Sequence, residues 1–163
     1  MAGYEIADAV NRIIEHVESV MSGLKAEKII FFLDEPGLGQ AGFSFKEWWE
    51  FIFADFSVTR GVHICGDMDW DQLFEAEIDI VSFDASKSER DITKYPKYKD
   101  FRNKGGRVAW GVLEKEDVKD FREGDLITLP CGMGTKLYTV DDCPKVLKKL
   151  NKIAKEVAVL VQP

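Results

Sequence analysis

A histidine and two cysteines stand at the ends of apolar runs, where their side chains could bind one metal ion together. His63 and Cys65 are two residues apart in the stretch GVHICGD, residues 61–67. Alternate residues of a β-strand project to the same face, so this imidazole and thiol would lie side by side. Cys131 follows a later apolar run, and Asp84 ends another between them. Two thiolates, an imidazole and a carboxylate suit zinc, and a catalytic zinc keeps one position open for water or substrate.

The same residue types also have structural roles, and the sequence leaves these alternatives open. A free cysteine is usually a small buried hydrophobe, a lone histidine often only packs, and His-x-Cys is a short match. A disulfide between Cys65 and Cys131 is a further alternative, which a reducing compartment disfavours. For His16, in the first amphipathic pattern, and for Cys143, just before Pro144, we predict packing roles.

Composition and charge narrow the class of protein. The 163 residues fit one domain, and 45% hydrophobic with 31% charged residues is ordinary for a globular chain. The net charge of -7 and the pI near 4.9 argue against a general nucleic-acid binder, which would carry a basic patch. No apolar run reaches the about 18 residues of a membrane span. The first residues show no secretory pattern and the 3 cysteines no disulfide spacing, so we expect a cytoplasmic protein.

Helix-like and strand-like patterns alternate along the chain, which predicts an α/β fold with a parallel sheet. We expect a single domain, with a leading amphipathic helix in residues 1–27, five strand–helix units in 28–143 and a final helix in 144–163. Apolar runs closed by turn residues predict strands within residues 28–37, 62–65, 78–84, 107–113 and 126–132. Three- and four-residue apolar spacing predicts helices over residues 4–22, 45–55, 69–77, 96–104, 114–124 and 144–161.

Nearly every rare or ionisable residue of these predicted strands stands at a carboxyl end. The residues concerned are Asp34, His63, Cys65, Asp84, Trp110 and Cys131. In parallel α/β proteins, ligands bind and reactions occur at the carboxyl edge of the sheet. We therefore expect the side chains of His63, Cys65, Asp84 and Cys131 to converge at one rim.

Several of these segments resemble the catalytic barrel of cobalamin-independent methionine synthase and its relatives. That superfamily also contains corrinoid-dependent thiol methyltransferases and uroporphyrinogen decarboxylase. The similar segments occur in the family order within residues 28–137 and are FFLDEPGLG, VHICGD, IVSFDAS, GGRVAWGVL and LPCGMGT. The decarboxylase branch fits poorly, because its chemistry needs no zinc and gives the His-x-Cys pair no purpose.

The resemblance implies roles for individual residues. It implies zinc ligands at His63, Cys65 and Cys131, and it places Asp84 where the methionine synthases have a glutamate ligand. It also implies that Asp34 receives the amino group of the substrate, and that Asp34, Glu35 and Trp110 line the substrate site. For Trp110, packing within the barrel is an equal alternative. The implied reaction transfers a methyl group from a methylfolate or a methylcorrinoid protein to a homocysteine-like thiol. Its catalytic residues would be Asp34, as the anchor of the amino group, and Asp84, as a possible fourth zinc ligand that the substrate displaces.

The chain is too short for the whole barrel that the resemblance implies. A TIM (β/α)8 barrel takes about 250 residues, whereas the predicted strands match only family strands four to eight. The segment between Trp110 and Cys131 is also shorter than in the family. A second copy, a separate N-terminal half-barrel, or loops and the first helix would have to cover the open sheet. The alternative function is a non-catalytic half-barrel for binding or self-assembly, with a structural zinc.

Overall fold

The computed structural model describes residues 2–34, 45–53, 57–133 and 138–159, and it confirms an α/β fold. All pairings within its five-stranded sheet are parallel, and the strands lie in chain order. The strands are β1 (Ile30–Asp34), β2 (Thr59–Ile64), β3 (Ile80–Asp84), β4 (Arg107–Gly111) and β5 (Leu126–Thr128). The α-helices are α1 (Ala2–Ser22), α2 (Phe45–Phe53), α3 (Trp70–Glu75), α4 (Tyr98–Asn103) and α5 (Cys143–Ala158).

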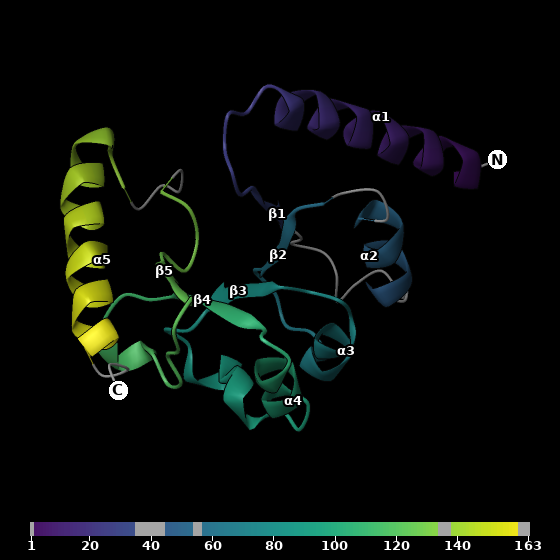
Figure 1. Ribbon diagram of the computed structural model, residues 1–163. Coiled ribbons are helices and arrows are strands. Elements are labelled where there is room, and N and C mark those ends of the chain that lie inside the picture. Colours follow the sequence, from purple (N-terminus) through teal and green to yellow (C-terminus); the bar gives the residue numbers. More distant parts are fainter. Residues whose placement is uncertain (1, 35–44, 54–56, 134–137, 160–163) are drawn as a thin grey trace.

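The order of the strands sends the connecting helices to one face of the sheet. Right-handed crossovers between parallel strands that follow each other in space place every crossover helix on the same side. Figure 1 shows α2, α3 and α4 along one side of the sheet and α5 beside β5. The main core lies between these helices and the sheet, and its largest fully buried side chains include Trp49, Leu73, Phe83 and Trp110.

The other face of the sheet carries small and polar side chains towards the carboxyl ends of the strands. Asp34 pairs with His63, and His63 pairs with Ser82, so these three project to the same face. At the neighbouring level the ring of Phe32 fills the space that a Cβ on Gly61 would occupy, at 2.6 Å. This face, opposite the helices, therefore holds the predicted site.

The helix predicted over residues 114–124 does not form, and that part of the prediction is wrong. Only a short 3-10 turn, Lys115–Asp117, follows β4. The Asp117 carboxylate accepts hydrogen bonds from the backbone N–H groups of Leu113 and Glu114, at 2.8 and 2.9 Å, which closes this turn tightly. β5 is also shorter than the predicted 126–132, and Pro130, which has no N–H to donate, follows it closely.

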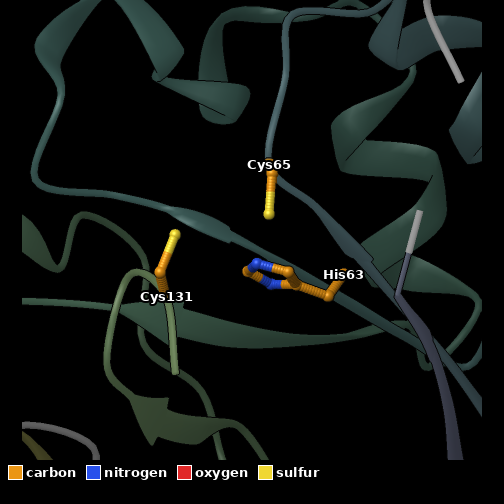
Figure 2. Close-up of side chains that lie close together, drawn as sticks. All are labelled: His63, Cys65 and Cys131. Atoms are coloured by element: carbon orange, nitrogen blue, oxygen red, sulfur yellow. The ribbon is translucent and has the colours of Figure 1, made fainter. Parts of the chain in front are cut away.

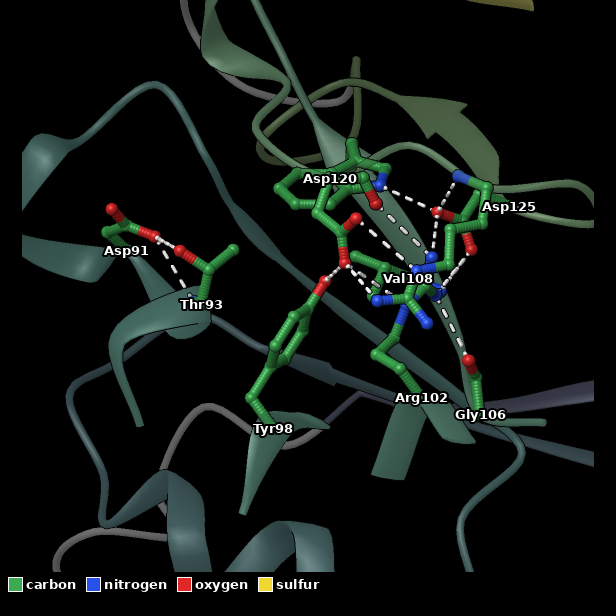
Figure 3. A network of polar contacts seen from close by, with 10 residues as sticks. Asp91, Thr93, Tyr98, Arg102, Gly106, Val108, Asp120 and Asp125 are labelled. Atoms are coloured by element: carbon green, nitrogen blue, oxygen red, sulfur yellow. Dashed lines mark hydrogen bonds and ion pairs between the residues drawn. The ribbon is translucent and has the colours of Figure 1, made fainter. Parts of the chain in front are cut away.

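A buried ion pair holds the connection that replaces the missing helix (Figure 3). Arg102 on α4 forms two bonds to Asp125, at 2.6 and 2.7 Å, and the two side chains are 1% and 0% exposed. Asp125 also accepts hydrogen bonds from the backbone N–H of Val108, at 2.9 Å, and from the indole of Trp110, at 3.0 Å. Together these bonds fix the start of β5 against β4.

α1 is amphipathic, as predicted, but it stands clear of the sheet and its covering helices (Figure 1). Ile13 and Val20 on its apolar face are exposed. Among the helices in the described part of the chain, none is both long and apolar enough to cross a lipid bilayer.

Candidate metal centre

His63, Cys65 and Cys131 come together at the carboxyl edge of the sheet. One ligand atom from each lies within 4.8 Å of those of the other two. Figure 2 shows the sulfur of Cys65 directed towards the imidazole ring of His63 and the side chain of Cys131 beside it. Zinc bonds of about 2.0–2.3 Å in a tetrahedron separate ligand atoms by about 3.6–3.8 Å. The three atoms therefore need to close by at most about 1 Å to hold one zinc ion.

A hydrogen bond to the neighbouring strand orients His63. Its Nδ1 lies 2.9 Å from the hydroxyl oxygen of Ser82, which is 5% exposed. This contact leaves Nε2 as the nitrogen available to a metal. A ligating histidine generally donates its other N–H to such a partner, which fixes the tautomer and the ring orientation. Ser82 therefore fits the role of a positioning residue for the imidazole.

We expect Ser82→Ala to weaken zinc binding about 10- to 100-fold, the usual effect of losing a partner behind a metal ligand. The change removes the acceptor of the Nδ1 proton and leaves the ring free to turn. Zinc competition against a chromophoric chelator measures the affinity. Ser88→Ala is the matched control, because Ser88 is exposed and lies outside the cluster. Equal zinc affinities for the two variants would contradict the role of Ser82.

Cys65 follows directly after β2, and the pKa of its thiol depends on burial and on the charged groups around it. Burial raises the pKa of its thiol, and the nearby Cys131 and Asp34 raise it further, as negative neighbours do. Arg90 acts in the opposite direction, and its Nη1 donates to the carbonyl oxygen of Cys65 at 2.7 Å. A metal ion must therefore displace a proton from Cys65, so metal affinity falls as the pH falls.

Gly111 permits the approach of the segment that carries Cys131. A Cβ at position 111 would lie 2.3 Å from the carbonyl oxygen of Phe83 and 2.8 Å from the Cα of Pro130. Both are backbone atoms, which cannot move aside as a flexible side chain can. A glycine at the end of β4 thus lets residues 129–131 cross close to the sheet and brings the last thiol to the rim.

Asp84 does not join the cluster. It is buried at the end of β3, where its Oδ1 accepts hydrogen bonds from the backbone N–H and the hydroxyl of Ser86, at 3.1 and 2.6 Å. Its Oδ2 lies 3.6 Å from the ammonium of Lys87. The carboxylate is thus engaged in the turn after β3, and it is not among the three residues whose ligand atoms converge.

Of the residues predicted to line the substrate site, Asp34 lies near the cluster and Trp110 does not. Asp34 lies beside the cluster, with its Oδ1 4.0 Å from the sulfur of Cys65. Trp110 is 1% exposed and pairs in register with Phe83, on the face that the helices cover. This position is opposite to the face of His63, so Trp110 packs in the core and does not line the site. Glu35 lies outside the described residues.

Two residues at the site were missed from the sequence. The strand spacing could have indicated Ser82, because it stands two residues before Asp84 in the same predicted strand and so projects to the same face. Arg90 had none, because it lies in the polar stretch 85–97, whose path no periodicity predicts. The three cysteines are free thiols, and Cys143 donates to the carbonyl oxygen of Thr139 at 3.6 Å at the start of α5.

Comparison of the chain with protein-family models found no match, and comparisons with curated proteins and with solved structures found no significant match either. The geometry of the site and the motifs in the sequence are therefore the observations that bear on function.

Proposed function

We propose that this chain is the zinc-binding part of a methionine synthase-like methyltransferase, which activates a thiol for methyl transfer. The observation that carries the proposal is the convergence of His63, Cys65 and Cys131 within 4.8 Å at the carboxyl edge of a parallel sheet. Zinc bound there by three protein ligands would supply one open position, where a substrate thiol loses its proton and becomes a nucleophile at neutral pH.

The residues of the chain would hold and orient the partners of this reaction. Nε2 of His63 and the two sulfurs would hold the metal, with Ser82 keeping the imidazole in place through Nδ1. Asp34, exposed beside Cys65, would receive the ammonium group of a homocysteine-like substrate. The methyl donor would be a methylfolate or a methylcorrinoid protein. A reducing compartment such as the cytoplasm would keep both thiols available as ligands.

The sheet topology supports the barrel part of the proposal. Five parallel strands in chain order, with helices along one face, form the repeating pattern from which a (β/α)8 barrel is built. In such a barrel the remaining strands would complete the wall opposite this sheet and bind the methyl donor. We therefore expect methyl transfer to need a partner that closes the open side of the sheet.

A second candidate is a non-catalytic module in which zinc is a structural link. One observation favours it: the cluster joins the end of β2 to the loop after β5, and β5 has only three residues, Leu126–Thr128. A metal at this place would tie a short edge strand to the centre of the sheet. Four closed ligands, rather than three and an open position, would characterise such a site.

Zinc content and thiol binding together test the proposal. We expect about one zinc per chain, as a site with these three ligands would hold. A His63→Ala, Cys65→Ala double variant should hold none, and its circular dichroism reports whether it folds. Homocysteine should shift the zinc X-ray absorption edge, because only an open position admits a thiolate sulfur. Wild-type metal content in the double variant would refute the site, and an edge that homocysteine leaves unchanged would favour the structural role.

A further inference from the structure

The large exposed apolar side chains of the described residues belong to the first and the last elements of the chain and the segments next to them. None lies between residues 33 and 112, although most of that stretch is described. One group belongs to α1, β1 and the link between them: Ile13, Val20, Leu24, Ile30 and Phe32. The other belongs to β5, α5 and the segments next to them: Leu113, Val140, Leu147 and Val159. Exposed apolar surface concentrated on particular elements is a feature of interaction sites.

Each group includes residues at an open edge of the sheet: Ile30 and Phe32 lie on β1, and Leu147 lies on α5, which packs beside β5 (Figure 1). β1 pairs only with β2, and β5 pairs only with β4, among the strands of the described chain. An edge strand presents unpaired backbone N–H and C=O groups, which can pair with a strand of another chain. Each end of the sheet therefore offers hydrogen-bonding groups together with apolar surface.

The helices at the two ends carry opposite charges. α1, with the sequence AGYEIADAVNRIIEHVESVMS, has four acidic residues and one arginine. α5, with the sequence CPKVLKKLNKIAKEVA, has five lysines and one glutamate. All five lysines line a surface groove of about 620 Å³ along this helix. Lys148 and Lys155 form no ion pair with any described residue, so their charges are open to a partner.

We infer that the partner of this sheet is a second copy of the chain, with the α1–β1 end of each copy docked on the β5–α5 end of the other. The two ends complement each other in charge, whereas two α1 helices or two α5 helices would repel. A two-fold axis repeats the contact, so the pair uses all four open ends and leaves no free edge. The small and polar face with His63 and Cys65 then faces the interior of the pair. Apolar surface, unpaired strand edges and opposite charges would stabilise the contact between the two copies. None of these requires the metal, so the pair should form with or without zinc.

Charge-reversal variants test this arrangement by light scattering. Glu15→Lys with Glu18→Lys changes the side-chain charge of α1 from -3 to +1. Lys145→Glu, Lys148→Glu and Lys155→Glu together change that of α5 from +4 to -2. All five residues are exposed, and among them Lys145 alone forms an ion pair with a described residue, Asp142. We expect the wild-type chain to have the mass of two copies. The dissociation constant of the pair should be at least 10-fold higher for each variant than for the wild type. Lys99→Glu with Lys104→Glu on and after α4 is the matched control, and it should pair as the wild type does.

Mixing the two variants gives the decisive result. A chain with a basic α1 and a basic α5 complements a chain with an acidic α1 and an acidic α5 at both contacts. We therefore expect the equimolar mixture to recover a two-copy species with one chain of each kind, which native mass spectrometry identifies.

Several outcomes would overturn the inference. A wild-type mass of one copy at every concentration, pairing that neither variant weakens, a mixture that stays dissociated, or open-ended longer assemblies would each do so. Circular dichroism shows that a dissociated variant is still folded. Zinc content, measured on the same samples, reports on the proposed function separately, so failure of the pairing and failure of the metal site are distinguishable.

Discussion

Asp125→Ala should lower the free energy of unfolding by about 3–5 kcal/mol, the usual cost of removing one partner of a buried ion pair. The carboxylate of Asp125 is fully buried and holds both Nη atoms of Arg102, at 2.6 and 2.7 Å. Its loss leaves the buried guanidinium with only the carboxylate of Asp120, which lies 3.8 Å from its Nε and is 34% exposed. It also leaves the N–H groups of Val108 and Trp110 without their acceptor. Urea unfolding followed by tryptophan fluorescence measures the change.

Two further variants show whether the buried charge is the cause. Glu123→Ala, at an exposed acid of the same segment, should change the unfolding free energy by less than about 0.5 kcal/mol, as surface substitutions do. Arg102→Met combined with Asp125→Leu should recover part of the loss, because an apolar pair leaves no uncompensated charge. A cost below about 1 kcal/mol for Asp125→Ala would contradict the buried pair.

Asp125→Ala also tests whether the buried ion pair supports the metal site. Arg102 on α4 and Asp125 before β5 fix the segment that leads to Cys131, in the place where a helix was expected. Loss of this anchor should therefore loosen the loop that carries the last thiol. Zinc affinity of the folded Asp125→Ala protein, measured below its unfolding midpoint, should fall although no ligand has changed.

Cys131→Ser should weaken zinc binding more than Ser82→Ala does, because it removes a proposed zinc ligand itself. Loss of a hydrogen-bond partner of a ligand costs about 10- to 100-fold in affinity. Cys131 is one of three residues whose ligand atoms lie within 4.8 Å, and a serine hydroxyl does not ionise near neutral pH as a zinc-bound thiol does. Titration of the purified chain against a competing chelator measures the affinity at constant pH.

Cys143→Ser is the matched control for this substitution. Cys143 lies at the start of α5, where its thiol contacts the carbonyl oxygen of Thr139 and not the cluster. Its zinc affinity should equal that of the wild type. Equal losses in the two variants would mean that zinc binds through cysteines in general, and wild-type affinity in Cys131→Ser would remove that residue from the site.

Strand prediction succeeded where the chain has long apolar runs. Residues 78–84 read as a strand from their continuous hydrophobicity, and β3 (Ile80–Asp84) is buried along its whole length. Prediction failed over residues 114–124, whose charges suited an exposed helix. There Asp120 accepts a hydrogen bond from the hydroxyl of Tyr98, and Asp125 binds Arg102 and the backbone N–H of Val108. Such long-range bonds leave no periodic trace in the sequence.

Local patterns in the chain were enough to predict the α/β class, the parallel sheet and the placement of His63 and Cys65 side by side. These follow from hydrophobic periodicity and from the two-residue repeat of a strand, which are local properties. Three features were visible only in the folded chain: Cys131 reaches this pair, Asp84 bonds to Ser86 instead, and Trp110 faces the core. The reason is physical: those positions depend on strand register, on the close approach at Gly111 and on the buried pair of Arg102 and Asp125.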